Sequence, residues 1–573
     1  MTALLTDNLP LLAGAPNGIK KLRELILELA VRGKLVPQDP SDEPASELLA
    51  RIASASTQLV AGGKAKKGNI KGGAEAQGVG SVELPTTWTW TSFDDLIDPE
   101  YPIAYGVLVP GPDVADGIPF VRIADLDLVA PPHKPEKSIS QEVDRQFERT
   151  RIRGGEILMG VVGSIGKLGI APESWAGANI ARAICRLVPS EHVSKGYIIW
   201  LLQSDLMRKQ FLGDTRTLAQ PTLNVGLIRS AATPLPPLAE QHRIVAKVDE
   251  LMALCDRLEG QQADAESAHA QLVQALLVSL TQTSDANEFA ANWQRLAEHF
   301  HTLFTTEPSI DALKQTLLQL AVMGKLVPQD PSDEPASELY KSIEAEKQRL
   351  VAAKKIKDTS RLEPVSTDEE LFTAPSSWVW VRMGDICRPI SSGSTPSSEL
   401  FQYDEGIPFL KVYNIRNQEI DFEYKKQFVS PEHHAEKMKR SALVPGDVVM
   451  NIVGPPLGKV AIIPATFPEW NCNQAIVFFG LIAPVSPQYI YTFLKEGSFL
   501  KNIALIGTAG QDNISVTKSK NIAVPLPPLA EQHRIVAKVD QLMALCDQLK
   551  TRLTQARQLN EQLASTLVEQ ALA

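Results

Sequence analysis

Residues with reactive side chains occur in this sequence, but none of them completes a catalytic motif. Residues 160–168, GVVGSIGKL, are similar to a phosphate-binding loop, yet the spacing is wrong and Leu168 stands where a Ser or Thr must bind magnesium. The pairs His433–His434 and His299–His301 are of a kind found most often on protein surfaces. No HExxH motif, dinucleotide-binding glycine fingerprint or zinc-deaminase pattern is present. We therefore expect no catalytic residue, no metal site and no cofactor.

The composition is that of a soluble, globular, cytoplasmic protein. Of 573 residues, 44% are hydrophobic and 22% charged, and no run approaches the roughly 18 to 20 apolar residues needed to cross a bilayer. The first residues lack the basic start and long apolar run of a signal peptide. The cysteines are odd in number and form no CxxC pair, which favours a reducing compartment over a disulfide framework. They are Cys185, Cys255, Cys387, Cys472 and Cys546.

The net charge of −10 argues against a free-standing DNA-binding protein, which usually carries a basic domain. It is compatible with a subunit whose partners supply much of the positive surface around DNA. Charge alone would not indicate nucleic acid.

An internal repeat determines the predicted architecture. LELAVRGKLVPQDPSDEPASELL at residues 27–49 returns, nearly unchanged, as LQLAVMGKLVPQDPSDEPASELY at residues 318–340. PLPPLAEQHRIVAKVDELMALCDRL at 234–258 returns in the same way at 525–549, with the same shift of 291 positions. The chain therefore contains two copies of one unit.

Between these blocks the halves diverge but keep a skeleton of strands and turns. GIPFVRI at 117–123 corresponds to GIPFLKV at 406–412, and GEILMGVVGSIGK at 155–167 corresponds to GDVVMNIVGPPLGK at 446–459. The shared pieces are β-branched runs and Gly or Pro turns, which hold a fold. The loops differ, and loops usually carry recognition residues. This pattern favours one scaffold, present twice, whose two copies recognise different ligands.

Each half is predicted to contain a helical segment, a mixed α/β domain and a long helix. We expect helical residues 1–60, a flexible Gly- and Lys-rich linker at 61–81, domains at 82–235 and 372–524, a central helical region at 236–356 and a final helix at 525–573. The fold class is α+β: two tandem mixed α/β domains separated by long helices that form an antiparallel coiled coil, with a pseudo-twofold repeat.

The long helices carry matched apolar seams with the spacing of a coiled coil. One seam is Ile244, Val248, Leu251, Cys255 and Leu258, and the other is Ile535, Val539, Leu542, Cys546 and Leu549. Two identical seams favour helices that pack on each other. The alternative is that each helix packs on its own domain.

The repeated blocks resemble the specificity subunit of type I restriction–modification systems. The resemblance rests on GKLVPQDPSDEPASELL followed by a domain that ends in PLPPLAEQHRIVAKVDELM, present twice. SSGSTPS at 391–397 is similar to the opening turn of that family's target-recognition domains, whereas YGVLVPG at 105–111 matches it less well. The resemblance implies a non-catalytic subunit whose domains each read half of a split, asymmetric double-stranded DNA target. It also implies two docked methyltransferase subunits, which bind S-adenosylmethionine, and motor-nuclease subunits.

Arg, Lys, Asn and Gln side chains on turns are the candidates for contact with bases and phosphates. In the first domain they are Arg122, Lys167, Arg182, Arg216 and Gln220. In the second they are Lys411, Asn414, Arg416, Lys459, Gln474, Gln511 and Asn513. Lys167 and Lys459 follow glycine-bearing turns at matching places, which suits phosphate contact.

Three alternatives stay open. The chain could be a DNA methyltransferase with an embedded recognition domain, although NIVGPP at 451–456 separates the Asn and prolines of the adenine base-flipping motif by three extra residues. It could be a coiled-coil scaffold that binds only protein. It could also read DNA in a phage-defence system that methylates without restricting.

Overall fold

The computed structural model describes residues 11–62, 82–213, 222–283, 286–358, 361–402, 404–503 and 513–572. The chain divides into two compact units. The first unit holds Met1–Ala265 with Ala556–Ala573, and the second holds Glu266–Gln555. The boundaries fall within the two longest helices, α8 (Leu238–Gln282) and α16 (Leu529–Leu572), so each unit contains the beginning of one and the end of the other.

The first unit begins with α2 (Gly18–Val31) and α3 (Ala45–Ala61), and its strands form three small sheets. β1 (Thr89–Ser92) pairs with β9 (Ala232–Leu235). A four-stranded sheet has the order β2 (Ala104–Tyr105), β8 (Ile184–Leu187), β5 (Ile157–Gly160), β6 (Leu168–Ile170). A three-stranded sheet has the order β4 (Lys137–Ile139), β3 (Ile118–Val121), β7 (Asn179–Ile180).

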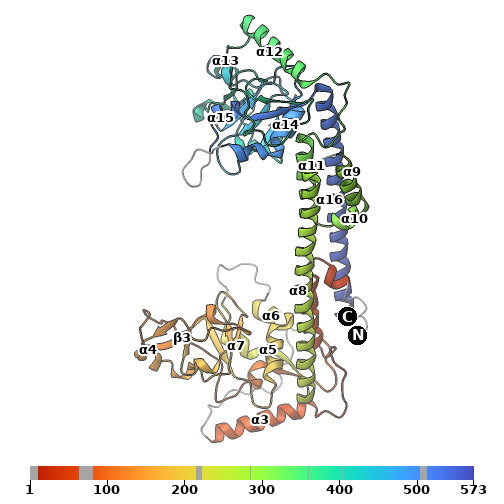
Figure 1. The fold of residues 1–573 in the computed structure, drawn as a ribbon. Coiled ribbons are helices and arrows are strands. Elements are labelled where there is room, and N and C mark those ends of the chain that lie inside the picture. The colour runs from red at the N-terminus through yellow and green to blue at the C-terminus, as the bar shows by residue number, and fades with distance from the viewer. Residues whose placement is uncertain are drawn as a thin grey trace. The chain divides into compact units, whose positions relative to one another are not determined.

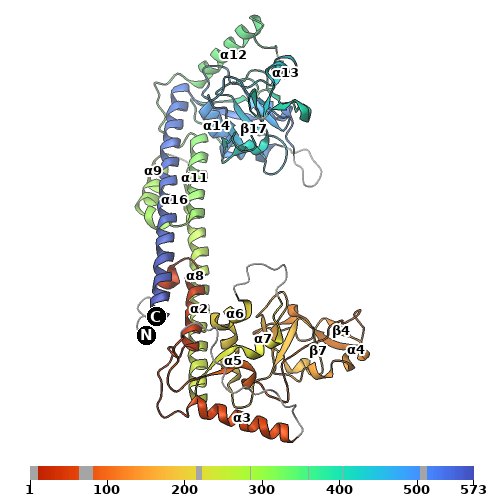
Figure 2. The same cartoon turned by 180° about the vertical axis from the view of Figure 1, so that it is seen from behind.

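Short helices cover these sheets. In Figures 1 and 2, α5 (Lys195–Gln203) and α6 (Asp205–Leu212) lie between the strands and α8, and α2 runs alongside α8. Ser194 and Ser204 cap α5 and α6, because each hydroxyl accepts a hydrogen bond from a first-turn backbone N–H. The remaining helices are α4 (Gln141–Arg145) and α7 (Val225–Ser230).

The second unit repeats these strand pairings and adds one strand to the third sheet and a separate hairpin. β10 (Val379–Arg382) pairs with β21 (Ala523–Leu526). The next sheet has the order β11 (Ser391–Ser392), β20 (Ile476–Phe479), β17 (Val448–Asn451), β18 (Val460–Ile462). The third has β12 (Phe401–Gln402), β16 (Phe428–Val429), β13 (Ile407–Leu410), β19 (Asn471–Cys472), and a hairpin joins β14 (Ile415–Arg416) to β15 (Glu419–Ile420). Its helices are α9 (Ala286–Glu298), α10 (Phe300–Leu303), α11 (Glu307–Val322), α12 (Ala336–Ala352), α13 (Pro431–Lys437), α14 (Pro487–Glu496) and α15 (Val516–Lys520).

Strand registers match between the units. Leu158 of β5 faces Arg186 of β8, and Val449 of β17 faces Phe478 of β20 at the corresponding place. In both units the third sheet contains one parallel pair, β3 with β7 and β13 with β19. The predicted mixed α/β class and the two sheet-rich domains are therefore confirmed.

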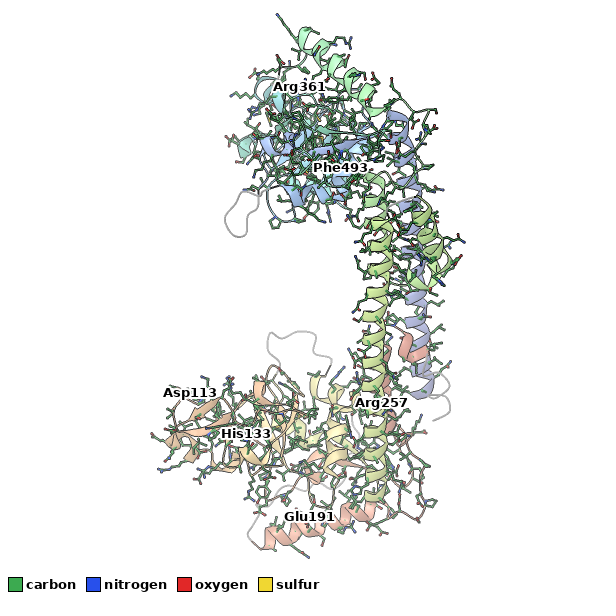
Figure 3. All side chains as sticks on the ribbon, viewed as in Figure 1. Asp113, His133, Glu191, Arg257, Arg361 and Phe493 are labelled. Atoms are coloured by element: carbon green, nitrogen blue, oxygen red, sulfur yellow. The ribbon has the colours of Figure 1, made fainter. Side chains whose placement is uncertain are left out.

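Each unit has its own core around its helices. Figure 3 places Arg257 on α8, whereas Asp113 and His133 lie on the strand side of the first unit. Phe493 of α14 is fully buried in the second unit's core. Ile244, Val248 and Cys255 are buried in the first unit, where Leu251 and Leu258 pack against the same core. Ile535 and Val539 are buried in the second unit, in a core separate from the one that holds Leu542, Cys546 and Leu549.

Candidate nucleic-acid interface

In the first unit, loops from separate strands meet at one end of the sheets. The backbone N–H of Val107, after β2, donates to the carbonyl of Ile180 at 2.8 Å. The N–H of Ala181 donates to Val121 at 3.0 Å, and the N–H of Arg182 donates to Val107 at 2.9 Å. The segment between β7 and β8 is therefore held between the ends of β2 and β3.

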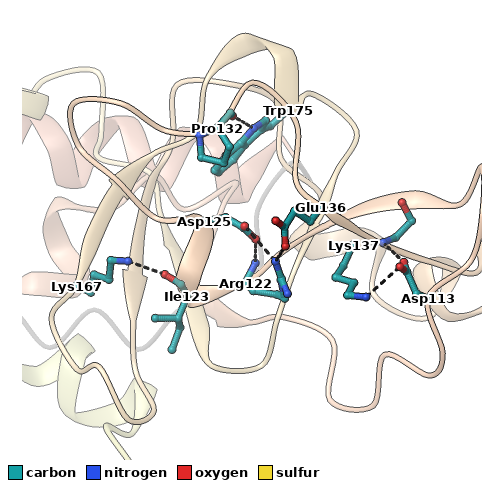
Figure 4. A network of polar contacts seen from close by, with 10 residues as sticks. Asp113, Arg122, Ile123, Asp125, Pro132, Glu136, Lys137, Lys167 and Trp175 are labelled. Carbon is teal, nitrogen blue, oxygen red and sulfur yellow. Dashed lines mark hydrogen bonds and ion pairs between the residues drawn. The ribbon is translucent and has the colours of Figure 1, made fainter. Parts of the chain in front are cut away.

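The glycine-bearing turn after β5 joins the same place. The N–H of Val161 donates to the carbonyl of Ala183 at 2.8 Å, and the N–H of Leu223 donates to Val161 at 2.8 Å. Figure 4 shows the Lys167 ammonium donating to the carbonyl of Ile123, at 3.0 Å. We name this surface the first edge, made by residues 105–111, 121–125, 161–167, 180–183 and 222–224.

The second unit builds a corresponding surface. Ser394 N–H donates to Cys472 at 3.1 Å, and Asn473 N–H donates to Leu410 at 2.9 Å. Ile452 N–H donates to Ala475, and Ile514 N–H donates to Ile452, both at 2.9 Å. We name this the second edge, made by residues 393–396, 410–414, 452–459, 472–475 and 513–514.

The candidate side chains on the first edge differ in solvent exposure and in whether a carboxylate already pairs with their charge. Lys167 and Arg182 are exposed. Arg122 is half-buried, and it donates to Glu136 at 2.7 Å and to Asp125 at 3.4 Å (Figure 4). Its hydrogen bond with Glu136 raises the pKa of Arg122 above its ordinary value. Its charge is thus already balanced by two carboxylates. Arg216 and Gln220 lie outside the described residues.

Most of the residues predicted to contact DNA in the second domain lie on the second edge. Gln474 is exposed, and its Oε1 accepts a hydrogen bond from the Thr395 hydroxyl. Lys411 lies 4.7 Å above the Phe401 ring. Lys459 is half-buried, and its backbone N–H donates to Asn451 Oδ1 at 2.7 Å. The Oδ1 atoms of Asn473 and Asn513 are buried and have no hydrogen-bond partner among the described residues. Gln511 falls outside those residues.

Asn414, which the sequence offered as a turn-borne candidate for DNA contact, lies inside the second unit. It is only 1% exposed. Its Oδ1 accepts from the Lys411 backbone N–H at 2.9 Å, and its amide donates to the carbonyls of Asp421 and Tyr424. At the corresponding turn of the first unit, the Asp125 carboxylate accepts a hydrogen bond from the Arg122 backbone N–H at 2.7 Å. Asn414 is therefore a buried capping residue that holds the turn after β13.

Arg416 belongs to a neighbouring cluster of aromatic and basic side chains that sequence reasoning overlooked. Its guanidinium lies 4.3 Å above the Tyr424 ring and 3.3 Å from Asp421. Lys425 lies 5.6 Å from the Tyr413 ring and 5.5 Å from the Tyr424 ring, and the two tyrosines meet edge to face. The sequence at 411–426, in which Tyr, Lys and Arg alternate, could have indicated this cluster. Aromatic rings beside cationic side chains are typical of surfaces that bind nucleic acid.

The structure also locates the reactive side chains. His434 of α13 is buried, 3.0 Å from the Asn471 amide and 3.3 Å from Glu469. Burial raises the pKa of Cys185 and of Cys472 to about 12, so neither thiol is activated as a nucleophile. In the described part of the chain, no three His, Cys, Asp or Glu side chains gather as metal ligands. Across the same residues, none of the helices combines the length and apolar character of a membrane span.

Comparison with known proteins identifies the family. The family model described as the type I restriction modification DNA specificity domain matches residues 113–266 and 375–557. The chain belongs to this family. This specificity subunit is 36% identical to the EcoEI specificity subunit of Escherichia coli and 35% identical to the EcoAI specificity subunit of the same species. Each match covers 97% of this chain and 94% of the relative.

A solved structure is also matched, at lower identity. A chain from a structural study of complex assembly and conformational transition of the type I R-M system gives a TM-score of 0.48 at 18% identity. The match covers 86% of this chain and 98% of that one.

Proposed function

We propose that this specificity subunit reads a split, asymmetric double-stranded DNA target, with one half bound at each edge. The observation that carries the proposal is a single loop arrangement built twice with different exposed side chains. Lys167 and Arg182 are exposed at the first edge, and Thr395 and Gln474 at the second. A constant frame fixes where the side chains stand, and their identities set which base pairs fit.

Catalysis lies on partner chains in this proposal. Two methyltransferase subunits, which bind S-adenosylmethionine, dock on the subunit, and motor-nuclease subunits complete a restricting complex in the cytoplasm. The buried thiols and the paired His434 support a chain that recognises DNA without acting on it. Partner surfaces around DNA would also offset the net charge of −10.

The long helices act as the spacer in this proposal, as an antiparallel coiled coil that relates two similar halves. Contacts within each unit support the pairing. In the first unit, Ala564 and Ala571 of α16 share a core with Cys255 of α8. In the second unit, Val273 and Leu277 of α8 share a core with Cys546 of α16. The beginning of each helix thus packs with the end of the other. The domain boundaries proposed are 82–235 and 372–524.

The decisive experiment maps the methylated DNA of cells that express this chain with its methyltransferase partner. We expect one asymmetric motif in two parts, separated by a fixed gap. A complex that assembles but methylates without sequence preference would refute the proposal. Methylation by the purified chain alone, abolished by a substitution in it, would revive the enzyme alternative.

A further inference from the structure

Each edge contains a close crossing of two loops that depends on glycine. A Cβ on Gly106 would lie 1.8 Å from the carbonyl oxygen of Ile180, and one on Gly393 would lie 1.9 Å from that of Cys472. Only a residue without a side chain allows this approach. The loop after β2 therefore lies directly on the strand end of β7, and the loop after β11 lies in the same way on β19.

Backbone hydrogen bonds put the two crossings in register. Val107 N–H donates to Ile180, and Ser394 N–H donates to Cys472. In the parallel pairs, Ile180 stands opposite Val121 and Cys472 opposite Leu410. Counting from these bonds, Leu108 occupies the place of Thr395, and Arg182 occupies the place of Gln474.

The two positions present different chemistry in each unit. In the second unit, Thr395 and Gln474 are both exposed and hydrogen-bond to each other across the crossing. In the first unit, Leu108 is 57% exposed, and Val109 beside it is 76% exposed. Arg182 is exposed and forms no ion pair with any residue that the structure describes. Leu108, Val109 and Arg182 are therefore open to contact by a ligand at the first edge.

These side chains suit different bases of a major groove. Arginine matches O6 and N7 of guanine, and apolar side chains contact the methyl group of thymine. Glutamine matches N6 and N7 of adenine. The Thr395 hydroxyl uses one lone pair of Gln474 Oε1. This leaves the second lone pair and the amide protons for a base, with the amide plane held in place.

We propose that these two positions form a specificity pair, read at the same step of each half-site. Leu108 with Arg182 selects guanine next to thymine in one half, and Thr395 with Gln474 selects adenine in the other. Thr395 is the positioning residue that orients Gln474. The inference rests on the proposed function, because it assigns base contacts within the edges already described.

The test transfers one pair into the other unit. The double variant Leu108→Thr with Arg182→Gln gives the first edge the pair of the second. The variant chain is assembled with its methyltransferase partner, and the methylated motif is sequenced. We expect guanine to be replaced by adenine at one position of one half-site and the preference for thymine at the adjacent position to weaken, with the other half-site and the gap unchanged. Binding to the original target should fall roughly 5- to 150-fold, as expected for one lost bidentate base contact.

Two controls isolate the specificity pair. Arg51→Gln on α3 makes the same exchange at an exposed arginine outside the edge, and it should leave motif and affinity unchanged. Thr395→Val removes the hydroxyl that orients Gln474. It should relax the adenine preference in the second half-site only, at an unchanged melting temperature, and Thr395→Ser should restore the preference.

The outcomes separate this inference from the proposed function. If the unmodified complex selects no bipartite motif, the proposed function fails. If it selects one and the double variant keeps the same motif, or loses affinity equally for all sequences, the specificity pair is wrong and the proposed function stands. A change at positions of the half-site beyond these two adjacent ones would also overturn the pair.

Discussion

At the scale of single residues, the availability of a charge matters more than its presence. Lys167, Arg122 and Arg182 all stand on the first edge, yet Arg122 already holds Glu136 and Asp125 (Figure 4). The Lys167 ammonium donates one of its three protons, to the carbonyl of Ile123. A lysine that neutralises a phosphate releases counter-ions condensed on the DNA, whereas an arginine already paired with two carboxylates neutralises little phosphate charge.

This difference predicts the salt dependence of DNA binding. Lys167→Gln should lower affinity for all sequences alike, and it should reduce the slope of log K against log salt by about 0.9, the value for one phosphate contact. Arg122→Gln should change the slope by much less. Titrations of the assembled complex with specific and unrelated duplexes, at several salt concentrations, measure both. Equal slopes for Lys167→Gln and the unmodified complex would exclude a phosphate contact.

Residue type and turn position were enough to find part of each edge. Lys167, Arg182 and Gln474 could be chosen because they are polar, follow strands and flank glycine turns. The burial of Asn414 could not be predicted, because a capping amide and a base-reading amide have the same sequence signal. Thr395 was missed because its role depends on Gln474, and only the fold brings these two positions together.

At the scale of elements, the repeated blocks contact one another through a buried glutamate in each unit, Glu240 or Glu531. We call this contact the joint. Trp88 Nε1 donates to Glu240 Oε2 at 2.9 Å, and Gln38 Nε2 donates to Oε1 at 2.5 Å. Trp378 and Gln329 hold Glu531 in the same way. These bonds thereby join the GKLVPQDP segment, the tryptophan immediately before β1 or β10 and the start of each long helix. This explains why these blocks are nearly identical in the two halves.

Removing one donor from this joint should destabilise the first unit. Burial raises the pKa of Glu240 above its ordinary value, and the bonds from Trp88 and Gln38 oppose that rise. Trp88→Phe leaves a buried carboxylate short of a donor, at a cost of about 1 to 3 kcal/mol in free energy of unfolding.

The loss should be greatest at neutral pH and shrink as pH falls. A carboxyl group whose folded-state pKa exceeds its unfolded value favours the folded state increasingly as it takes up a proton. Denaturant unfolding at pH 7 and pH 5 measures this, with Trp90→Phe as the matched control. An equal loss in both variants at both pH values would show that only ring volume matters.

In the second unit, an ion pair joins Arg382 to Glu369. Two hydrogen bonds from Arg382, at 2.7 and 2.9 Å, lower the pKa of Glu369 to about 2. A depressed carboxyl pKa stabilises the folded state above the unfolded value of about 4.5 and loses that contribution as pH falls towards 2. Glu369→Gln should therefore cost at most about 1 kcal/mol at pH 7, because Glu369 is 44% exposed. The difference in free energy of unfolding between variant and parent should be smaller at pH 3 than at pH 7. An equal difference at both pH values would contradict the pairing.

At the scale of the whole molecule, the two sheet-rich domains could be predicted from the repeat, but the packing of the helices only in part. Two matched seams indicated buried helix faces, and Ile244, Val248, Ile535 and Val539 are buried. The same apolar spacing suits either a partner helix or a neighbouring domain. In the first unit the α8 seam serves α2, the domain and the end of α16 together. Charged groups reinforce this, as Arg23 of α2 donates to Asp256 and Glu259 of α8, each at 2.7 Å.

If the long helices set the gap between the half-sites, lengthening them should lengthen the gap. The unit boundaries give matched positions for an insertion, after Ala265 in α8 and after Gln555 in α16. Four added residues in each helix extend it by about 6 Å, at 1.5 Å per residue. Base pairs rise about 3.4 Å along a strand, so the gap should grow by one to two base pairs, with both half-sites unchanged. Inserting in both helices keeps their facing residues aligned.

Sequencing the methylated motif of the double insertion measures the gap directly. Four residues added within 61–81, a segment that precedes the first domain and carries no seam, serve as the control and should leave the gap as it was. An insertion in α8 alone should weaken assembly, because it shifts Val273 and Leu277 away from Cys546. An active complex that carries both insertions and keeps the original gap would show that another element measures the DNA. A changed half-site sequence would place base contacts on the helices themselves, where the exposed charges flanking the seams would become the next residues to substitute.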